Sequence, residues 1–198
     1  MQQSRKSLKK SSQPKKGTVR IIGGSLGGRK INFTQAEGLR PTTDRVRETL
    51  FNWLMADINA ACCLDLFSGS GAIGLEAISR GAREVTFVES NKKVASNLKD
   101  NLSLLSIKNA KLINETAEKF LENNGKQFDL IFLDPPFAKG ILENILPKIK
   151  KHIAKDGLVY LEMENGDSKN IIQDDWEIIK SKKTSNIAYF LLRMSDKN

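Results

Sequence analysis

A glycine-rich segment that begins with an acidic residue is the first part of this 198-residue sequence whose residue types point to ligand chemistry. Asp65 lies in the apolar run CCLDLF, and Gly69, Gly71 and Gly74 follow where a helical pattern begins. The first two glycines allow a tight turn and a close approach to a ligand, and the third lets the helix pack near the strand. Glu89 follows the next apolar run, where a carboxylate can accept both hydrogen bonds of a ribose diol. The segment predicts a site for a nucleoside-containing cofactor rather than a purely structural turn, and so far it suits NAD equally.

A second segment, Asp134-Pro-Pro-Phe137, narrows the choice of ligand. It follows the run FDLIFL, so we place it at the carboxyl end of a strand, the edge of an open α/β sheet that faces the ligand crevice. Two prolines stiffen the loop and hold a backbone carbonyl outward. Asp134 and this carbonyl are acceptors, and Phe137 offers an aromatic face, which together suit a planar ring bearing an exocyclic amine. Accepting the N–H bonds of the amine orients it and stabilises the positive charge that develops as it attacks an electrophile.

The elements that must position these segments alternate along the chain. Candidate strands from Cys62 onward are CCLDLF, EVTFV, AKLIN, FDLIFL, GLVYLE, WEIIK and IAYFLL, and helical patterns between the first five cover 72–80, 91–104, 116–123 and 140–152. Alternating β and α units imply a parallel sheet with helices on both faces. Only a short loop separates the last two strands, which predicts an antiparallel hairpin at the sheet edge. The predicted fold is α/β: a three-layer Rossmann-like sandwich with a seven-stranded, mostly parallel sheet.

The chain before the predicted sheet contains only short secondary-structure patterns. Residues 1–16 are polar and basic, and we expect a disordered arm. The β-prone runs TVRIIGG and GRKINF predict a hairpin, and a helical pattern runs from Pro41 to Leu54. We therefore expect a hairpin-and-helix extension over 17–54 and an α/β domain over 55–198.

Charge is concentrated at the amino end. Nine of the 32 lysines and arginines lie between Met1 and Ala36, where there is no aspartate or glutamate, so the remaining basic residues balance the 23 acidic ones. A basic arm on a neutral body suggests a polyanionic partner. A solvated tail that keeps the protein in solution explains the same charge.

Several classes of protein are disfavoured. No apolar run approaches the ~20 residues needed to cross a bilayer, and the amino terminus lacks the apolar stretch of a secretory signal. Cys62 and Cys63 are adjacent, which suits core residues in a reducing, cytoplasmic compartment better than a disulfide framework or a metal site. A single histidine, His152, disfavours zinc chemistry and a Ser-His-Asp hydrolase. We expect His152 at the surface and no metal.

With these motifs in place, residues 62–137 resemble the class I S-adenosylmethionine-dependent methyltransferases, and DPPF matches the [DN]PP[FYW] motif of exocyclic-amine methylation. RPTTDRVRETLFNWL, preceded by RIIGG and GRK, resembles more narrowly the RsmD-type family of 16S rRNA (guanine(966)-N2)-methyltransferases, over roughly residues 17–193. The resemblance implies S-adenosylmethionine as cofactor and transfer of its methyl group to the N2 amine of a guanine in 16S rRNA. It also implies an assembling small ribosomal subunit as partner, and we expect a monomer.

The resemblance assigns roles residue by residue. The residues expected to hold S-adenosylmethionine are Asp65, Phe67, Gly69, Ser70, Gly71, Gly74, Glu89, Ser90, Thr116 and Ala117. The residues expected to bind the target guanine are Asp134, Pro135 and Phe137. The residues expected on the RNA side are Arg20, Arg29, Lys30, Arg40, Thr42, Thr43, Arg45, Arg47 and Pro136. Related enzymes often carry Asp or Asn at the position of Thr116, and the arginines near Asp44 and Glu48 could instead form ion pairs.

Two other functions remain open at this point. DPPF alone is shared with DNA adenine and protein glutamine methyltransferases, so N6-adenine methylation of DNA or RNA is the alternative within enzymes. A non-catalytic RNA-binding assembly factor is the alternative outside enzymes, although the intact Asp134 and glycines disfavour it.

Overall fold

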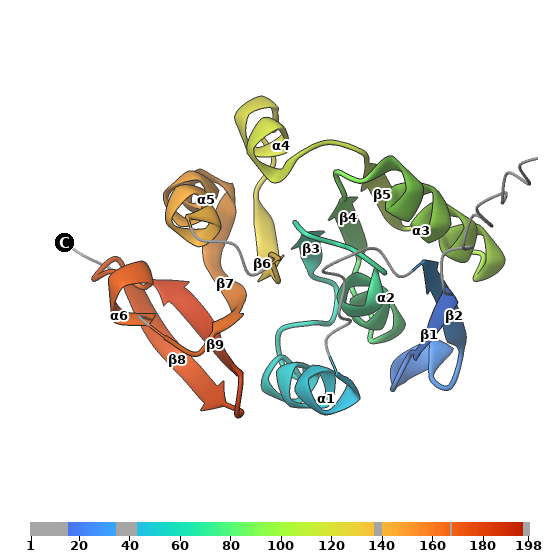
Figure 1. The fold of residues 1–198 in the computed structure, drawn as a ribbon, viewed down its shortest axis with the longest axis horizontal. Helices are drawn as coiled ribbons and strands as arrows, with labels where there is room; N and C mark the ends of the chain where they lie inside the picture. The colour runs from blue at the N-terminus through green and yellow to red at the C-terminus, as the bar shows by residue number, and fades with distance from the viewer. Residues whose placement is uncertain (1–15, 35–42, 137–139, 167, 196–198) are drawn as a thin grey trace, which may run out of the picture.

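The computed structural model describes residues 16–34, 43–136, 140–166 and 168–195, which form two sheets and the helices around them (Figure 1). In chain order the elements are β1 (Lys16–Arg20), a 3-10 helix (Gly24–Leu26), β2 (Lys30–Thr34), α1 (Asp44–Trp53), β3 (Cys62–Asp65), α2 (Ala72–Ser79), β4 (Glu84–Val88), α3 (Lys92–Leu104), β5 (Ala110–Ile113), α4 (Ala117–Asn123), β6 (Phe128–Leu133), α5 (Ile141–Ile149), a 3-10 helix (Lys150–His152), β7 (Ile153–Glu164), α6 (Ser168–Ile171), β8 (Trp176–Lys183) and β9 (Ile187–Met194).

The main sheet has seven strands in the order β5-β4-β3-β6-β7-β9-β8. The first five run parallel, and β9 is antiparallel to both β7 and β8. This confirms the predicted fold class, including the antiparallel hairpin at the edge. The strand order reverses between β3 and β6, and such a switch point opens the crevice where α/β proteins bind ligands. We call the side of the sheet where β3, β4, β5, β6 and β7 end the carboxyl edge.

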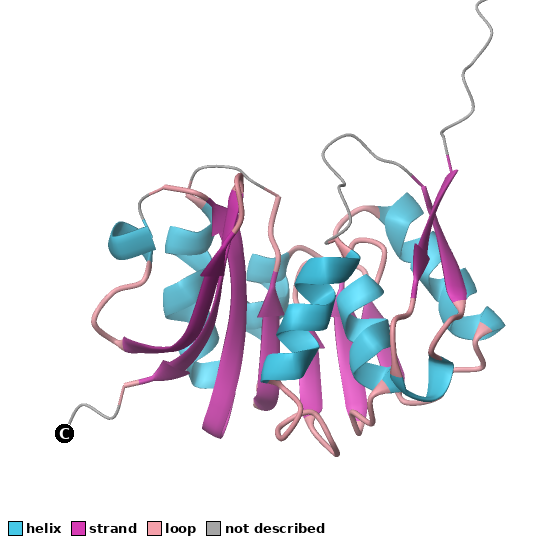
Figure 2. Cartoon of the chain, turned by 90° about the horizontal axis from the view of Figure 1, so that it is seen from below, coloured by secondary structure: helices cyan, strands magenta, loops and turns pink. Residues whose placement is uncertain are grey.

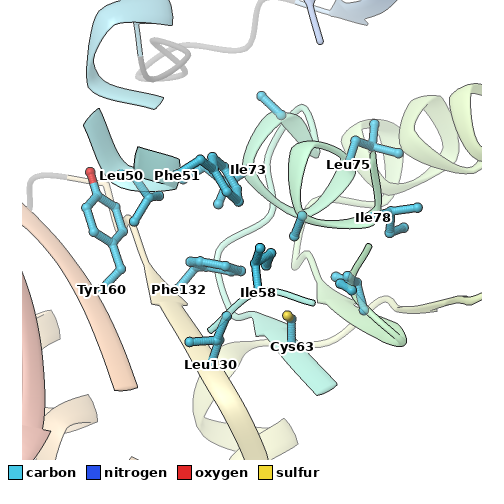
Figure 3. Close-up of a cluster of buried hydrophobic side chains, with 14 of the residues drawn as sticks. Leu50, Phe51, Ile58, Cys63, Ile73, Leu75, Ile78, Leu130, Phe132 and Tyr160 are labelled. Atoms are coloured by element: carbon cyan, nitrogen blue, oxygen red, sulfur yellow. The ribbon is translucent and has the colours of Figure 1, made fainter. Parts of the chain in front are cut away.

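Two apolar clusters cover the two faces of the sheet. Leu130 and Phe132 of β6 belong to a cluster with residues of α1, α2 and α3, whereas Ile131 and Leu133 belong to a cluster with residues of α4 and α5. Because strand side chains alternate between faces, this continuous apolar run is buried on both sides. Figure 1 shows α1 and α2 on one side of the sheet and α4 and α5 on the other. Figure 3 shows part of the first cluster, in which the rings of Phe51 and Phe132 lie 6.2 Å apart.

The predicted amino-terminal hairpin is present as the antiparallel pair β1–β2. It stands at one end of the molecule (Figure 2), beside α2 and α3 (Figure 1). β2 packs on α3, the 3-10 helix between the two strands packs on α2, and Val19, Ile31 and Phe33 belong to the first apolar cluster. Asn101 of α3 accepts a hydrogen bond from the backbone N–H of Asn32 at 3.2 Å and donates to its carbonyl at 2.7 Å. The hairpin is therefore fixed to the helices that flank the site.

Some details differ from the sequence predictions. The predicted arm lies outside the described residues except for Lys16, which begins β1. His152, expected at the surface, is 1% exposed, and its ring nitrogens lie 2.9 Å from the carbonyl oxygen of Leu121 and 3.1 Å from that of Lys126. Among the described residues, no helix combines the length and apolar character needed to cross a bilayer.

Candidate active site at the carboxyl edge

The glycine-rich turn after β3 is built around the buried carboxylate of Asp65. Its Oδ2 accepts a hydrogen bond from the backbone N–H of Gly74 at 3.1 Å, which joins the end of β3 to the first turn of α2. Gly69 and Gly71 have positive φ angles of 49° and 79°, where residues with a Cβ are strained. A Cβ on Gly74 would overlap the ring of Phe87 in β4. These glycines are therefore required by the turn and by the packing of α2 against the sheet.

Glu89, directly after β4, bridges this turn to the start of α3. Its Oε2 accepts from the N–H of Gly69 at 2.9 Å, and its Oε1 accepts from the N–H of Asn91 at 2.7 Å. A carboxylate offers about four acceptor positions, so both oxygens retain capacity for the hydroxyls of a ribose. Asn114, after β5, donates to the backbone carbonyls of Glu89 and Ser90 at 2.6 and 3.1 Å, a supporting role that the sequence analysis did not identify.

The remaining residues expected around the cofactor have different environments. Thr116 caps α4, because its hydroxyl accepts from the N–H of Lys119 at 3.3 Å, and its side chain is exposed. Ala117 and Ser70 are buried, Phe67 is half-buried, and Ser90 is exposed. The exposed position of Thr116 and Ser90 at the ends of strands leaves both available to a ligand at the carboxyl edge.

The Asp134-Pro-Pro segment follows β6, the strand next to β3 across the switch point. Asp134 is half-buried, Pro135 is buried and Pro136 is exposed, while Phe137 lies outside the described residues. Burial raises the pKa of Asp65 to about 7 against the opposing Gly74 hydrogen bond, and the charges of Asp134 and Glu89 add to the rise. The structure therefore brings the two sequence motifs together at one place, as predicted from their position after parallel strands.

A buried pair in β7 completes the acidic surroundings of Asp134. The hydroxyl of Tyr160 donates to Oε2 of Glu162 at 3.0 Å, and both side chains are buried. Burial, followed by the charge of Asp134, raises the pKa of Glu162 to about 8. Glu162 was not among the predicted site residues, although one acidic residue in the otherwise apolar run GLVYLE is a signal that could have identified it.

In the described part of the chain, no group of three or more His, Cys, Asp or Glu side chains is arranged to hold a metal ion.

The residues expected on the RNA side divide into exposed and buried ones. Exposed positions are occupied by Arg20, Arg29, Lys30, Thr43 and Arg45, whereas Arg40 and Thr42 lie outside the described residues.

The expectation that Arg47 binds RNA is wrong, because its side chain is completely buried and cannot contact RNA in this structure. It donates to Oδ1 of Asp44 at 2.6 Å and to the carbonyl of Arg20 at 2.8 Å, and its Nη1 lies 3.6 Å from Oε2 of Glu76. Glu76 was not predicted to matter, yet it stands alone as an acid in the apolar helix AIGLEAIS. Arg47 therefore joins the extension to α2, as a structural residue.

Comparisons with known proteins find relatives that align with most of this chain. The chain is 41% identical over 186 residues to the ribosomal RNA small subunit methyltransferase D of Escherichia coli, covering 93% of this chain and 94% of that protein. It is 44% identical over 191 residues to the protein of the same name from Haemophilus influenzae, covering 93% and 98%.

The fold agrees in the same way. The solved structure of the Escherichia coli protein yhhF superposes with a TM-score of 0.84 at 41% identity, covering 91% of this chain and 100% of that one. The family described as Conserved hypothetical protein 95 matches residues 19–193, and the family resemblance found in the sequence is thereby confirmed. Since these matches span nearly the whole of the described chain, the protein belongs to the Conserved hypothetical protein 95 family.

Proposed function

We propose that this protein transfers the methyl group of S-adenosylmethionine to the N2 amine of a guanine in 16S rRNA, at the position that corresponds to guanine 966 in the RsmD-type family. The observation that supports this most is the meeting of Asp134 with Asp65 and the glycine-rich turn at the switch point of the sheet. The names of the relatives, which specify the small-subunit ribosomal RNA, support the choice of substrate.

The residues at the carboxyl edge suit the cofactor. Glu89 would hold the ribose hydroxyls with the acceptor capacity left after its bonds to Gly69 and Asn91. The turn from Asp65 to Gly74 would lie along the methionine part, and Thr116 and Ala117 would border the adenine. When bound, S-adenosylmethionine supplies an electrophilic methyl group.

Asp134 would act on the other reactant. Its carboxylate accepts the N–H bonds of the guanine amine, which orients the nitrogen lone pair and stabilises the positive charge that develops on it. Pro135 and Pro136 have no N–H, so the carbonyls of this segment face the base without competing donors from its own backbone. We assign Phe137 the role of stacking on the guanine. The partner we propose is an assembling small ribosomal subunit in the cytoplasm, bound by a monomer.

The experiment that tests the function is mass spectrometry of nucleosides from 16S rRNA of cells with and without the gene. We expect loss of one N2-methylguanosine in the cells without it, and its return when the gene is restored. Loss of N6-methyladenosine instead would assign the enzyme to adenine, and an unchanged set of methylated nucleosides would contradict the proposal.

A further inference from the structure

A pair of lysines at the far edge of the sheet has no part in the site described above. Lys180 and Lys182 lie in β8, the last strand, and both side chains are exposed. Neither forms an ion pair with any residue that the structure describes. The sequence from Lys180 to Asn186 contains no acidic residue. Their charge is therefore available to a partner.

The register of the sheet places Lys182 at the level of Asp134. Leu133 and Leu161 are the last paired residues of β6 and β7, so the next residues along these parallel strands, Asp134 and Glu162, lie beside each other. Glu162 pairs with Tyr189 of β9, and Tyr189 pairs with Lys182. β8 is the third strand from β6, and neighbouring strands lie about 4.8 Å apart. Measured across the sheet, the backbones of Lys182 and Asp134 are therefore about 14 Å apart. Lys182 is thus close to the carboxyl edge, within reach of nucleotides next to a base held at Asp134.

Both lysines project from the face of the sheet that α1 covers. Lys180 and Lys182 pair with Leu191 and Tyr189, and paired residues share a face. The ring of Tyr189 lies 5.5 Å from that of Trp53 in α1, which identifies the face. The exposed Arg45, one of the residues assigned to RNA, belongs to the same helix.

The hairpin that carries the lysines is held in place at its turn. Asn165, after β7, donates from its backbone N–H to the carbonyl of Asn186 at 3.0 Å and from its side chain to that of Thr184 at 2.8 Å. Figures 1 and 2 show this hairpin and the basic β1–β2 hairpin at opposite ends of the molecule, and Figure 1 shows β3 and β6, the strands that carry the site, between them. A polyanion that reaches both would cross the carboxyl edge at the switch point.

We propose that Lys180 and Lys182 form a second RNA-binding surface, which contacts the phosphates of nucleotides flanking the target base on the side opposite the β1–β2 hairpin. This inference rests on the proposed RNA substrate. Lysines on an edge strand also prevent two sheets from pairing edge to edge, which would explain the same residues without RNA. The two explanations differ in the effect of charge reversal, because glutamates protect an edge as lysines do but repel phosphate.

The test compares the full-length protein with the double variant Lys180→Glu/Lys182→Glu, using purified small-subunit particles from cells without the gene. The control, Lys108→Glu/Lys155→Glu, makes the same change of charge at two exposed lysines. They lie near the amino ends of β5 and β7, away from the carboxyl edge. We expect particle affinity to fall on the order of ten-fold in the first variant, and the slope of log affinity against log salt to flatten by about 1.5 for two lost phosphate contacts. Turnover at saturating particles and affinity for S-adenosylmethionine should not change.

Two results would overturn the inference: unchanged affinity and slope in the β8 variant, or an equal loss in the control. If the β8 variant aggregates or loses S-adenosylmethionine affinity, Lys180→Gln/Lys182→Gln replaces it in the same comparison. Edge protection alone predicts that the soluble fraction of this second variant binds as the wild type does, which would overturn the inference. A wild-type protein that neither binds nor methylates the particles would contradict the proposed function itself, which is a different outcome.

Discussion

Arg47 and Glu76 form an ion pair between two side chains that are both completely buried, with 3.6 Å between Nη1 and Oε2. The pair joins α1 to α2, and the same carboxylate accepts hydrogen bonds from the backbone N–H groups of Ile22 and Gly23 at 2.7 and 2.9 Å. Arg80 also donates to Glu76 at 2.8 Å. One buried acid thus connects the β1–β2 hairpin, α1 and α2.

The first prediction concerns the stability that depends on this connection. Arg47→Met keeps most of the buried volume but leaves Glu76 without one of its two cationic partners. Removing one member of a buried pair costs about 3–5 kcal/mol, so we expect a loss near the lower limit because Arg80 remains. Urea unfolding measures the change. The control is Arg45→Met at an exposed position of the same helix, for which we expect less than about 0.5 kcal/mol. Equal stability of the two variants would contradict the role assigned to Arg47.

The second prediction concerns the cofactor. Glu89→Gln keeps an oxygen that can accept from Gly69 but removes the charge that strengthens hydrogen bonds to ribose. We expect affinity for S-adenosylmethionine, measured by calorimetry, to fall by about 1.5–3 kcal/mol. Glu122→Gln, at an exposed position of α4, is the control and should bind normally. A Glu89→Gln protein with wild-type affinity would remove Glu89 from the site.

The third prediction concerns the transfer step. Asp134→Ala removes the acceptor for the guanine amine, and its loss should appear mainly in turnover because the interaction strengthens as charge develops. We expect single-turnover methylation of small-subunit particles, at saturating S-adenosylmethionine, to slow by about 10²–10³-fold. Asp156→Ala, an exposed acid near the opposite end of β7, should leave the rate unchanged. A folded, cofactor-binding Asp134→Ala protein with the wild-type rate would exclude the mechanism.

The fourth prediction concerns pH. The pKa of Glu162 is raised from its ordinary 4.5 to about 8, first by burial and then by the charge of Asp134. Folding therefore favours its protonated form, so its contribution to stability is complete below pH 4.5 and is lost as the pH rises through about 8. We expect the free energy of unfolding to fall over this range by up to about 1.4 kcal/mol per pH unit from this group. Glu162→Gln, which cannot ionise, should show a flatter dependence in urea unfolding, and an identical slope in both proteins would show that Glu162 is ionised throughout.

The strands and helices of the sheet could be predicted because their apolar runs and helical periodicities are local. The meeting of Asp65 with Asp134 was also predictable, since Asp65 ends one parallel strand and Asp134 directly follows another. His152 was assigned wrongly because its neighbours Lys150 and Lys151 are polar, whereas the carbonyls of Leu121 and Lys126 that surround it come from a distant part of the sequence.

Sequence reasoning also gave Arg47 the wrong role and did not identify Glu76, the buried acid that pairs with it, although the helical spacing contained a signal for Arg47. Arg47 is spaced by three, four and seven residues from Leu50, Phe51 and Leu54, all of which are buried. It therefore lies on the apolar face of α1. What such spacing could not show is the partner, because Glu76 is brought to Arg47 only by the packing of α2.

The anchoring of the β1–β2 hairpin determines where the entropic cost of binding falls. Its backbone is tied to α2 through Glu76 and to α3 through Asn101, so little conformational freedom is left for this part of the protein to lose. A partner that docks there meets a surface that is already in its bound shape, and association is then selective for RNA that is itself already folded to match. A loose strand must lose its own freedom to fit, whereas a pre-folded particle does not.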